Sequence, residues 1–223
     1  MNKLNHIAFI MDGNGRWGKR RNKGRNYGHY AGVKTVKKIV EASIKFKIPI
    51  VTFYVFSTEN WKRPRKEINF LFKLISTYFK AELSEVINNG IKINIVGEIS
   101  KLPNKLKLIL KETKNKTKKN KKIQVNLALN YGSKLELINT FKKIRFKKID
   151  EKNINKNLYT GKLPDPEILI RTGGRKRLSN FMLWQLAYTE LYFLDKLWPD
   201  FLPNDLYKVI KKYNKTKRNF GGI

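Results

Sequence analysis

The sequence lacks cysteine altogether and has no hydrophobic run long enough to cross a bilayer. Without cysteine it can form neither a disulfide framework nor a thiolate centre, which is compatible with a reducing compartment. The longest apolar stretch after the N-terminal region, residues 48–56, is interrupted by Pro49 and Thr52 and cannot span a membrane. The five-residue apolar run at 7–11 is too short for the core of a signal peptide. We therefore expect a cytoplasmic protein.

Acidic residues are scarce, because 17 Asp and Glu stand against 49 Lys and Arg, for a net charge of +32. This charge is compatible with a nucleic-acid or anionic-membrane surface, or with a lysine-rich composition. Lysines are 38 of the basic residues and occur in nearly every segment, whereas the 11 arginines cluster at the motifs. Composition therefore explains most of the charge, and no nucleic-acid partner is expected. The charge still favours peripheral association with anionic head groups at the inner face of the membrane.

The order of apolar patterns predicts a single α/β domain over residues 1–223, with a mainly parallel sheet of about six strands flanked by helices. The length and a hydrophobic content of 41% are sufficient for a core. Strands are expected at 7–11, 50–56, 91–97, 123–130, 168–170 and 192–194, and helices at 29–46, 64–88, 103–116, 133–144, 181–191 and 203–217. Ser133 and Glu136 have the spacing of a capping box. Residues 18–25 should form a basic loop, and residues 142–166 a flexible surface segment.

The first strand is followed directly by Asp12, Gly13, Asn14, Gly15 and Arg16. At the carboxyl edge of a parallel sheet, this turn lies where open α/β proteins bind ligands. Its glycines let backbone N–H groups approach a phosphate, and a following helix would present its positive end to the same anion. A carboxylate beside a phosphate requires a cation between them, and Mg²⁺ prefers these oxygen ligands. The turn therefore predicts a Mg²⁺-assisted diphosphate site.

Gly13, Gly15 and Gly18 also match the G-x-G-x-x-G pattern of nucleotide-cofactor sites. Such sites need an acidic residue about 20 positions later. The nearest candidate, Glu59, lies 41 residues past Gly18, and Asp12 would repel a metal-free pyrophosphate. No G-x-x-x-x-G-K-[S/T] loop is present either. The pattern therefore favours the diphosphate site over a dinucleotide or ordinary nucleotide site.

Two later loops carry further anion-binding side chains. Residues 57–64 follow the second strand. Taken alone, they are typical of a polar loop that ends in a proline at the start of a helix. Arg171 ends the fifth strand, with Arg177 and Ser179 soon after it. His29 alone would usually be a core or cap residue, but it follows Arg25 by four positions at a helix start, so both can face one anion. Together the loops predict a pocket for two clustered phosphate groups.

The long helix expected at 64–88 has a wide apolar stripe, which ordinarily faces the core. Together with the helix at 29–46, the stripe could instead line a hydrophobic cleft beside the phosphate site, and periodicity does not separate these alternatives. No two aspartates are adjacent anywhere in the chain. This excludes the D-D-x-x-D metal clusters of all-helical prenyl transferases.

The motifs resemble those of the cis-prenyltransferases, most closely the bacterial undecaprenyl diphosphate synthase type. The shared blocks occur in family order: H-I-A-F-I-M-D-G-N-G-R-W (6–17), G-H-Y-A-G (28–32), F-S-T-E-N-W-K-R-P (56–64), N-Y-G (130–132), I-R-T-G-G (170–174), R-L-S-N-F-M-L-W-Q (177–185), E-L-Y-F (190–193) and L-W-P-D-F (197–201). The resemblance implies a homodimer with a hydrophobic tunnel between helices and sheet. It also implies Mg²⁺-dependent, repeated condensation of isopentenyl diphosphate with an allylic primer such as farnesyl diphosphate. The product would be a Z-polyprenyl diphosphate, the lipid-carrier precursor for cell-wall glycan synthesis.

The same resemblance implies roles for individual residues. Asp12 and Glu190 would be the metal-associated carboxylates, and Asn60 would receive the proton, although a diphosphate oxygen is a plausible alternative because a neutral amide is a poor base. The substrate-binding residues would be Gly13, Asn14, Gly15, Arg16, Trp17, Arg25, His29, Ser57, Thr58, Glu59, Trp61, Arg63, Arg171, Arg177, Leu178 and Ser179.

Two other functions remain as alternatives to catalysis. Charge alone favours a basic nucleic-acid-binding module, but that function gives no reason for the Asp-Gly-Asn-Gly turn. The second alternative is a non-catalytic scaffold subunit of a prenyltransferase. The presence of Asp12 and of the complete set of arginines disfavours it. The chain departs from the family at Asn219, where related enzymes commonly carry arginine. We therefore do not extend to this chain a contribution of the tail to the active site of a partner subunit.

Overall fold

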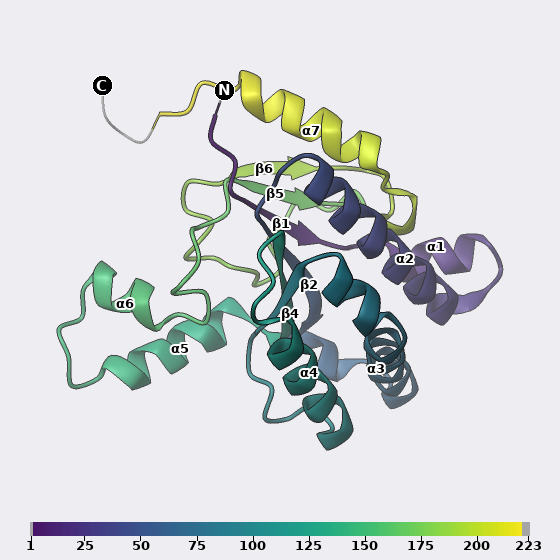
Figure 1. The fold of residues 1–223 in the computed structure, drawn as a ribbon, viewed down its shortest axis with the longest axis horizontal. Coiled ribbons are helices and arrows are strands. Elements are labelled where there is room, and N and C mark those ends of the chain that lie inside the picture. The colour runs from purple at the N-terminus through teal and green to yellow at the C-terminus, as the bar shows by residue number, and fades with distance from the viewer. Residues whose placement is uncertain (1, 220–223) are drawn as a thin grey trace.

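The computed structural model describes residues 2–219, and its centre is a six-stranded, all-parallel sheet in the order β3-β4-β2-β1-β5-β6 (Figure 1). The strands are β1 (His6–Ile10), β2 (Ile50–Ser57), β3 (Ile91–Val96), β4 (Ile123–Tyr131), β5 (Ile168–Arg171) and β6 (Glu190–Phe193). The α-helices are α1 (Asn14–Arg20), α2 (Gly24–Lys45), α3 (Arg65–Asn88), α4 (Asn104–Thr117), α5 (Ser133–Ile144), α6 (Glu151–Asn157) and α7 (Pro203–Lys215), with short 3₁₀ turns η1 (Thr58–Lys62) and η2 (Trp198–Asp200). The predicted α/β class with a parallel sheet is confirmed.

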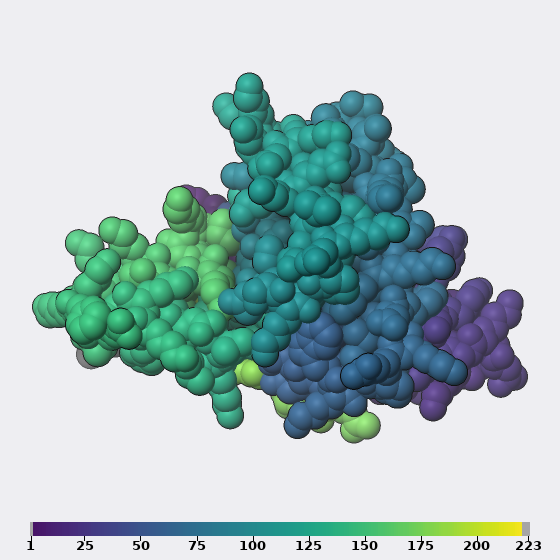
Figure 2. All heavy atoms as spheres, turned by 90° about the horizontal axis from the view of Figure 1, so that it is seen from below, coloured from purple at the N-terminus to yellow at the C-terminus, as the bar shows by residue number. Residues whose placement is uncertain are grey.

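The two faces of the sheet are covered differently. Apolar side chains of α2, α3, α4 and α7 pack on one face around rings such as Phe9, Phe53 and Trp198. The other face is covered largely by the irregular segment 178–186, whose Phe181 and Met182 pack against β1, β4 and β5. Helices α5 and α6 form a lobe that stands out beside the main body (Figures 1 and 2). Part of the hydrophobic stripe of α3 therefore faces the core, which is the first of the two alternatives predicted for it.

The helices differ from the sequence prediction in three places. Of the loop predicted at 18–25, residues 18–20 belong to α1 and residues 24–25 to α2. The two helices pack with their backbones in contact, since a Cβ at Gly28 would lie 1.8 Å from the Asn14 carbonyl oxygen. Residues 151–157 form α6 within the segment expected to be flexible. The helix predicted at 181–191 was wrong, since this segment folds into turns and Met182 has a positive φ.

The capping box predicted at Ser133 and Glu136 was also wrong. Gly132 takes the N-cap position, with no side-chain cap. Glu136 is instead fully buried and accepts hydrogen bonds from the Tyr131 hydroxyl at 2.5 Å and the Gln185 amide at 3.1 Å. Burial, partly offset by these hydrogen bonds, raises the pKa of Glu136. Tertiary partners therefore determine the position of this carboxylate, rather than the helix terminus.

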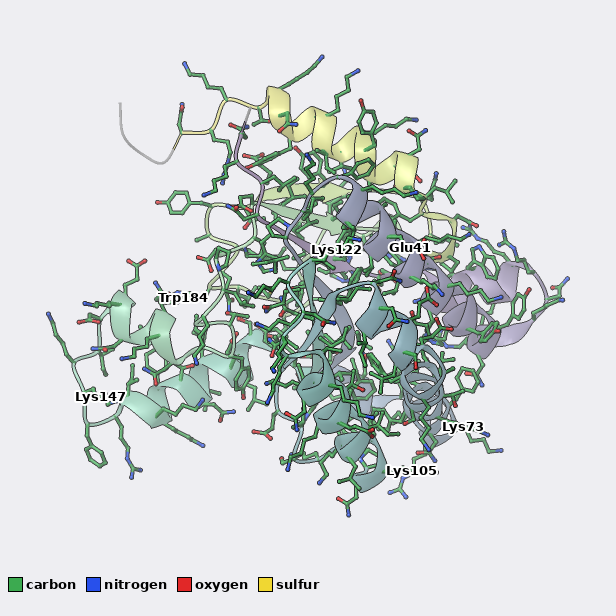
Figure 3. The ribbon with its side chains drawn as sticks, viewed as in Figure 1. Glu41, Lys73, Lys105, Lys122, Lys147 and Trp184 are labelled. Atoms are coloured by element: carbon green, nitrogen blue, oxygen red, sulfur yellow. The ribbon has the colours of Figure 1, made fainter. Side chains whose placement is uncertain are left out.

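The excess of lysine is spread over the surface rather than gathered on one face. Lys73 on α3, Lys105 on α4 and Lys147 after α5 are all exposed and project outward from separate elements (Figure 3). This distribution agrees with the interpretation of the net charge as a matter of composition. No helix within residues 2–219 is long and apolar enough to cross a membrane.

A chain of hydrogen bonds crosses the buried middle of the sheet and begins at His6. His6 Nδ1 lies 2.8 Å from the Pro164 carbonyl oxygen, which can only accept, so Nδ1 carries the proton. Nε2, at 2.6 Å, then accepts from the Thr52 hydroxyl, which itself accepts from the Asn126 amide at 2.9 Å. Every polar group is paired only while the imidazole is neutral. Burial accordingly lowers the pKa of His6 to about 4.

The protein should lose stability as the pH falls from about 6.5 to about 4, because in this range His6 binds a proton in the unfolded state but not in the folded state. At 1.36 kcal/mol per pKa unit, the full loss is about 3 kcal/mol. Urea unfolding of wild type and His6→Gln at pH 7 and pH 4.5 measures it. The variant should show the smaller change in unfolding free energy. Equal changes in wild type and His6→Gln would rule out this role for His6.

Candidate active site

A polar cavity of about 620 Å³ lies at the carboxyl ends of β1, β2 and β5. Parallel strands end at one edge, so three loops far apart in the sequence meet there, as predicted. The cavity is lined by Ile10, Met11, Asp12, Asn14, His29, Tyr54, Val55, Ser57, Glu59, Asn60, Arg63, Leu71, Arg171, Arg177, Ser179 and Asn180. It therefore contains residues from each of the loops that the sequence singled out.

Asp12 lies between two arginines from different segments. Its Oδ1 accepts from Arg16 Nη2 at 3.2 Å, and its Oδ2 accepts from Arg171 Nη2 at 3.0 Å. The backbone of Asp12 is fixed as well, since its carbonyl accepts from the Thr172 hydroxyl at 2.8 Å and from the Trp198 N–H at 3.1 Å. The carboxylate remains 30% exposed toward the cavity, so a cation or a substrate can still reach it.

Arg171 is a buried cation with one unused donor. Its Nη1 donates to the Ser179 hydroxyl at 2.8 Å and to the Arg177 carbonyl. Its Nε has no hydrogen-bond partner among residues 2–219, and the same holds for Asn14 Oδ1. A buried donor without a partner in the protein is uncommon, so this N–H is available to hydrogen-bond a group that enters the cavity. Ser179 and Asn180 both have positive φ, and this turn folds the segment back over Arg171.

A second group of cations gathers on one carboxylate, and we call Arg25, His29, Arg63 and Glu67 the Glu67 cluster. Arg25 makes a two-pronged contact with Glu67 at 3.0 Å for both nitrogens, while His29 and Arg63 lie at 3.3 and 3.2 Å. Burial lowers the pKa of His29, with Glu67 opposing the shift. Burial opposes ionisation of Glu67, but Arg25 and Arg63 outweigh it and lower the pKa of Glu67. The cluster therefore presents a net positive charge beside the cavity.

An apolar channel continues from the polar cavity between α2, α3 and the sheet. The channel shares Met11, Asn14, His29, Val55 and Leu71 with the cavity, so the two are contiguous. Beyond these side chains it is walled mainly by aliphatic and aromatic groups of both helices and β4. The alternative that the α3 stripe lines a hydrophobic cleft is thus also correct for part of the stripe.

Comparison with known proteins gives one consistent family. The family model described as "Putative undecaprenyl diphosphate synthase" matches residues 10–221. An isoprenyl transferase of Prochlorococcus marinus is 45% identical over 227 residues, covering 98% of this chain and 84% of the relative. That of Treponema denticola is also 45% identical, with 98% of each chain covered. This chain belongs to the undecaprenyl diphosphate synthase family of cis-prenyltransferases.

Solved structures of the family have the same fold. A lavandulyl diphosphate synthase of Lavandula x intermedia, solved in complex with dimethylallyl diphosphate, gives a TM-score of 0.95 at 32% identity and 98% coverage of both chains. A "probable undecaprenyl diphosphate synthase" of Campylobacter jejuni gives 0.85 at 34% identity and covers both chains fully. The chain is therefore an enzyme that transfers prenyl groups, as the sequence motifs predicted.

Several predicted site residues lie beside the cavity rather than in its wall. Trp17 donates to Asp200 at 2.6 Å and stacks on Tyr27 outside it, while Trp61 donates to Asn130 at 2.8 Å. Leu178 packs in the apolar cluster on the other sheet face. The remaining supporting residues are Gly13, Gly15, Arg16, Arg25 and Thr58, which flank the turns that form the wall.

The two glycines of the first turn, Gly13 and Gly15, are each required for a different structural reason. Gly13 is the N-cap of α1 at φ +115°, and a Cβ there would lie 2.8 Å from Leu197. A Cβ at Gly15 would lie 2.6 Å from Arg25 Nη1, so this glycine makes room for the arginine. Both are needed for the turn geometry on which the predicted phosphate approach depends.

Glu190 is not brought to Asp12 within one chain. It starts β6 and pairs with Ile168, which pairs with Ile7 at the opposite end of the sheet. Asp12 lies five residues beyond Ile7, or about 16 Å along the strand direction. Arg218 is the cation nearest to the Glu190 carboxylate, at 3.9 Å. The exposed Asn219 lies in this tail, and residues 220–223 lie outside the described part of the chain.

The oxygens at the cavity fit a Mg²⁺ ion that is held mainly by substrate. No group of three or more His, Asp or Glu side chains within residues 2–219 could enclose a metal. Two carboxylates line the cavity: Asp12 lies among cations that suit phosphate, whereas Glu59 accepts from Asn180. Mg²⁺ commonly takes one or two carboxylates together with substrate phosphate oxygens. The donor set therefore fits this ion.

The sequence prediction missed Glu67 and Asn180. Arg63 and Glu67 have the i, i+4 spacing of an ion pair at a helix start, a signal that was available. Asn180 donates to Glu59 at 2.8 Å across two loops, and nothing in the sequence connects these positions. The amide oxygen of Asn60 accepts the Ser57 N–H at 3.2 Å, so it helps to fix the η1 turn.

Replacing Glu67 with glutamine should lower the free energy of unfolding by about 1–2 kcal/mol, because Arg25 and Arg63 lose their shared counter-charge. Added inorganic diphosphate should restore more stability to Glu67→Gln than it adds to wild type, since the anion replaces the missing charge. Thermal unfolding with and without diphosphate measures both effects. Glu112→Gln, which breaks an exposed pair with Lys116, is the control. A diphosphate shift no larger than that of wild type would contradict the prediction.

Proposed function

We propose that this prenyltransferase condenses isopentenyl diphosphate repeatedly with an allylic diphosphate primer, such as farnesyl diphosphate, to give a Z-polyprenyl diphosphate. The observation that carries the proposal is the position of Asp12, between two arginines at the end of an apolar channel. The lavender relative is solved with dimethylallyl diphosphate, an allylic diphosphate, which supports the substrate class. The product would serve as the lipid-carrier precursor for cell-wall glycan synthesis.

In this proposal the Glu67 cluster and the first turn hold the primer's diphosphate. Its prenyl tail enters the apolar channel, which is contiguous with the cavity at His29. Arg171, Arg177 and Ser179 hold isopentenyl diphosphate on the opposite wall. The two substrates then meet above Asp12, and this fixed arrangement converts their encounter into an intramolecular step.

The chemical step separates charge, and the site is arranged to stabilise it. The allylic carbon–oxygen bond breaks, the alkene of isopentenyl diphosphate attacks the allylic carbon, and a proton leaves the adduct. Arginine and histidine donors stabilise the negative charge on the departing diphosphate. Mg²⁺, held by Asp12 and phosphate oxygens, would supply further stabilisation of that leaving group. A diphosphate oxygen suits the proton better than Asn60, whose amide oxygen already accepts from Ser57.

The channel gives a reason for repeated addition. Each buried CH₂ group contributes roughly 0.8 kcal/mol, so a prenyl tail in an apolar channel is retained between additions. Only the polar head must exchange when one diphosphate leaves and the next isopentenyl unit enters. Release of the long product at a membrane surface would complete the cycle, and the basic surface favours such contact with anionic lipid.

If Glu190 contributes to metal binding, as the family resemblance implies, it must act at the site of a second copy. It lies at the sheet edge opposite Asp12, too far away within one chain. Exposed apolar side chains along α5 and the following loop, Ile138, Phe141, Phe146 and Ile149, are a surface that a second subunit would cover. We therefore propose a homodimer that assembles its metal ligands from both subunits.

Mixing Asp12→Ala and Glu190→Ala proteins should restore activity that neither variant has alone, because one site of each mixed dimer then retains both carboxylates. Co-expression of the two variants with different affinity tags, followed by an elongation assay on the doubly purified dimer, measures this. A mixed dimer as inactive as its parents, or a wild-type protein that is monomeric in sedimentation, would contradict the shared site.

The assay that tests the proposed function incubates purified protein with farnesyl diphosphate, labelled isopentenyl diphosphate and Mg²⁺. The product is then dephosphorylated and sized. We expect a ladder of prenols that grows with time and stops when Mg²⁺ is chelated. Absence of any product longer than the primer would reject the proposal, and undiminished elongation in excess chelator would reject the role of the metal.

A further inference from the structure

A groove opens on the outside of α4, where this helix runs beside the end of β3. Its volume is about 610 Å³, and within residues 2–219 it shares no lining residue with the diphosphate cavity or with the apolar channel. The lining residues are Ile95, Gly97, Ile99, Asn104, Lys107, Leu108, Leu110, Lys111 and Lys114. We call this site the α4 groove, and it is separate from the active site.

The α4 groove begins where the cover of the β3 edge ends. β3 is an edge strand of the sheet. On this edge the Ile91 carbonyl accepts from Asn120 Nδ2 at 2.8 Å, and the Ile93 N–H donates to Thr117 Oγ1 at 3.1 Å. Alternate residues of a strand direct their backbone groups to the same side, so Ile95 is the next in this row. Ile95 lies in the wall of the groove instead, at a position where proteins commonly protect an edge strand with charged side chains.

The other wall of the groove is a face of α4 that combines lysine with exposed hydrocarbon. Lys107, Lys111 and Lys114 follow one another at intervals of four and three residues, so their side chains form a row along the helix. Leu108 lies beside this row and is 69% exposed, whereas the core-facing side chains of α4 are buried. The two isoleucines of the groove are only partly buried. The groove therefore has an apolar floor next to a row of ammonium groups.

The ammonium groups have no counter-charge in the groove, since none of its lining residues within 2–219 is acidic. Lys107 Nζ donates one hydrogen bond to the Ser100 carbonyl oxygen at 3.2 Å, which holds it over the loop after β3. Two acids close by in the sequence have other partners. Glu98 accepts from the Ser100 N–H at 3.0 Å, and Glu112 pairs with Lys116 at 2.7 Å. The groove therefore suits a ligand that carries negative charge next to hydrocarbon.

The α4 groove lies at the same edge of the sheet as the active site. Ile95 and Gly97 are at the carboxyl end of β3, and parallel strands end at one edge. β3 is three strands away from β1, or about 14 Å across the sheet. Helix α4 lies at the lower surface of the molecule in Figure 1, which is the surface that Figure 2 shows. Contact at the groove would therefore hold the active-site edge of the sheet close to the contacting surface.

We infer that the α4 groove docks this enzyme on a bilayer that contains anionic phospholipid. The lysine row meets the phosphate groups of the lipid, and Leu108 with the isoleucine floor contacts the hydrocarbon just below them. A soluble phosphate would use the lysines and leave the exposed apolar floor in water, so the combination favours a lipid surface. Docking here would provide the membrane contact of the proposed function and rests on that function in this respect alone, since it can be measured without substrate.

Vesicle binding tests this docking. Wild-type protein should co-sediment with vesicles of phosphatidylglycerol and phosphatidylcholine, and much less with vesicles of phosphatidylcholine alone. The combined variant Lys107→Gln, Lys111→Gln and Lys114→Gln should raise the lipid concentration for half-binding by at least about tenfold, since each lysine near an anionic surface contributes about fivefold. Leu108→Gln keeps the charge and should raise this concentration about threefold, because the apolar contact is lost.

The matched control removes the same charge from another face. Lys208, Lys211 and Lys215 are exposed and form a similar row on α7, which lies on the opposite side of the molecule from α4 (Figure 1). Replacing these three with glutamine should change the half-binding concentration by less than about threefold, because their charges lie more than a Debye length from the docked lipid. An equal loss in the two triple variants would overturn the inference, since net charge rather than the groove would then explain the binding.

The lack of cysteine in the chain allows a direct test of which face meets the lipid. Leu108→Cys labelled with an environment-sensitive fluorophore should shift its emission to shorter wavelengths on anionic vesicles, whereas Lys211→Cys with the same label should not. A shift at Lys211→Cys as large as that at Leu108→Cys, or no binding of wild type to anionic vesicles, would overturn docking at α4 and leave the elongation assay unaffected. Failure of elongation with intact vesicle binding would instead reject the proposed chemistry alone.

Discussion

Asp12→Asn should retain the fold and lose about a thousandfold in kcat, the largest effect expected of any single substitution here. Asparagine has nearly the same shape, and its amide oxygen can still accept from one of the two arginines, while its NH₂ group faces the other. It loses the negative charge that offsets these cations and attracts Mg²⁺. The variant thus separates the chemical role of the carboxylate from its packing. Single-turnover elongation measures the loss, and far-ultraviolet circular dichroism verifies the fold.

Asp150→Asn is the matched control for this substitution. Asp150 caps α6 by accepting the Asn153 N–H at 2.8 Å, a contact that asparagine also makes, and it lies in the lobe away from the cavity. Its turnover should equal that of wild type. The residual activity of Asp12→Asn should respond weakly to Mg²⁺ concentration, because the protein ligand has been removed. A variant with wild-type turnover, or with an unchanged Mg²⁺ dependence, would exclude Asp12 as the metal-associated carboxylate.

The parts of the fold that were predictable are those where local pattern and tertiary environment agree. β1, β2 and β4 are buried, β-branched or aromatic runs, and α3 begins after Pro64 and ends before Gly90, as its punctuation indicates. The convergence of the three loops followed from one rule, that parallel strands end at a common edge. Asp12 and Arg171 could thus be predicted to lie together although they are 159 positions apart in the sequence.

The misses have a common physical cause, since in each case a distant partner outweighed the local signal. The spacing of Ser133 and Glu136 indicates a cap, yet Glu136 turns inward to Tyr131 and Gln185. The apolar stretch 181–191 has a helical composition, but Ser179, Asn180 and Met182 adopt positive φ and the segment closes over the sheet. The metal role of Glu190 stays a prediction, but its register in β6 places it at the other end of the sheet from Asp12 within one chain, which its motif did not indicate. Sequence spacing carries no information about such long-range pairing.

Arg171→Lys should lower kcat/KM for isopentenyl diphosphate by about a hundredfold, while the KM for the allylic primer changes much less. The guanidinium joins Asp12, Ser179 and the Arg177 carbonyl at once, and its Nε remains without a partner in the chain. Lysine keeps the charge but offers one nitrogen, which cannot make all of these contacts. The unpaired Arg177 carbonyl should also lower the free energy of unfolding by about 1–3 kcal/mol.

Arg175→Lys provides the control, since Arg175 lies four residues further on the same loop and is exposed. Initial rates measured while each substrate is varied in turn distinguish the two walls of the cavity. A selective rise in KM for isopentenyl diphosphate places that substrate on the Arg171 wall, because loss of stability alone would affect both substrates equally. If Arg171→Lys instead impaired both substrates to the same degree, Arg171 would act only by holding Asp12. The two diphosphates would then have to share the contacts of the Glu67 cluster, whose single buried carboxylate leaves one surplus of positive charge for two anions.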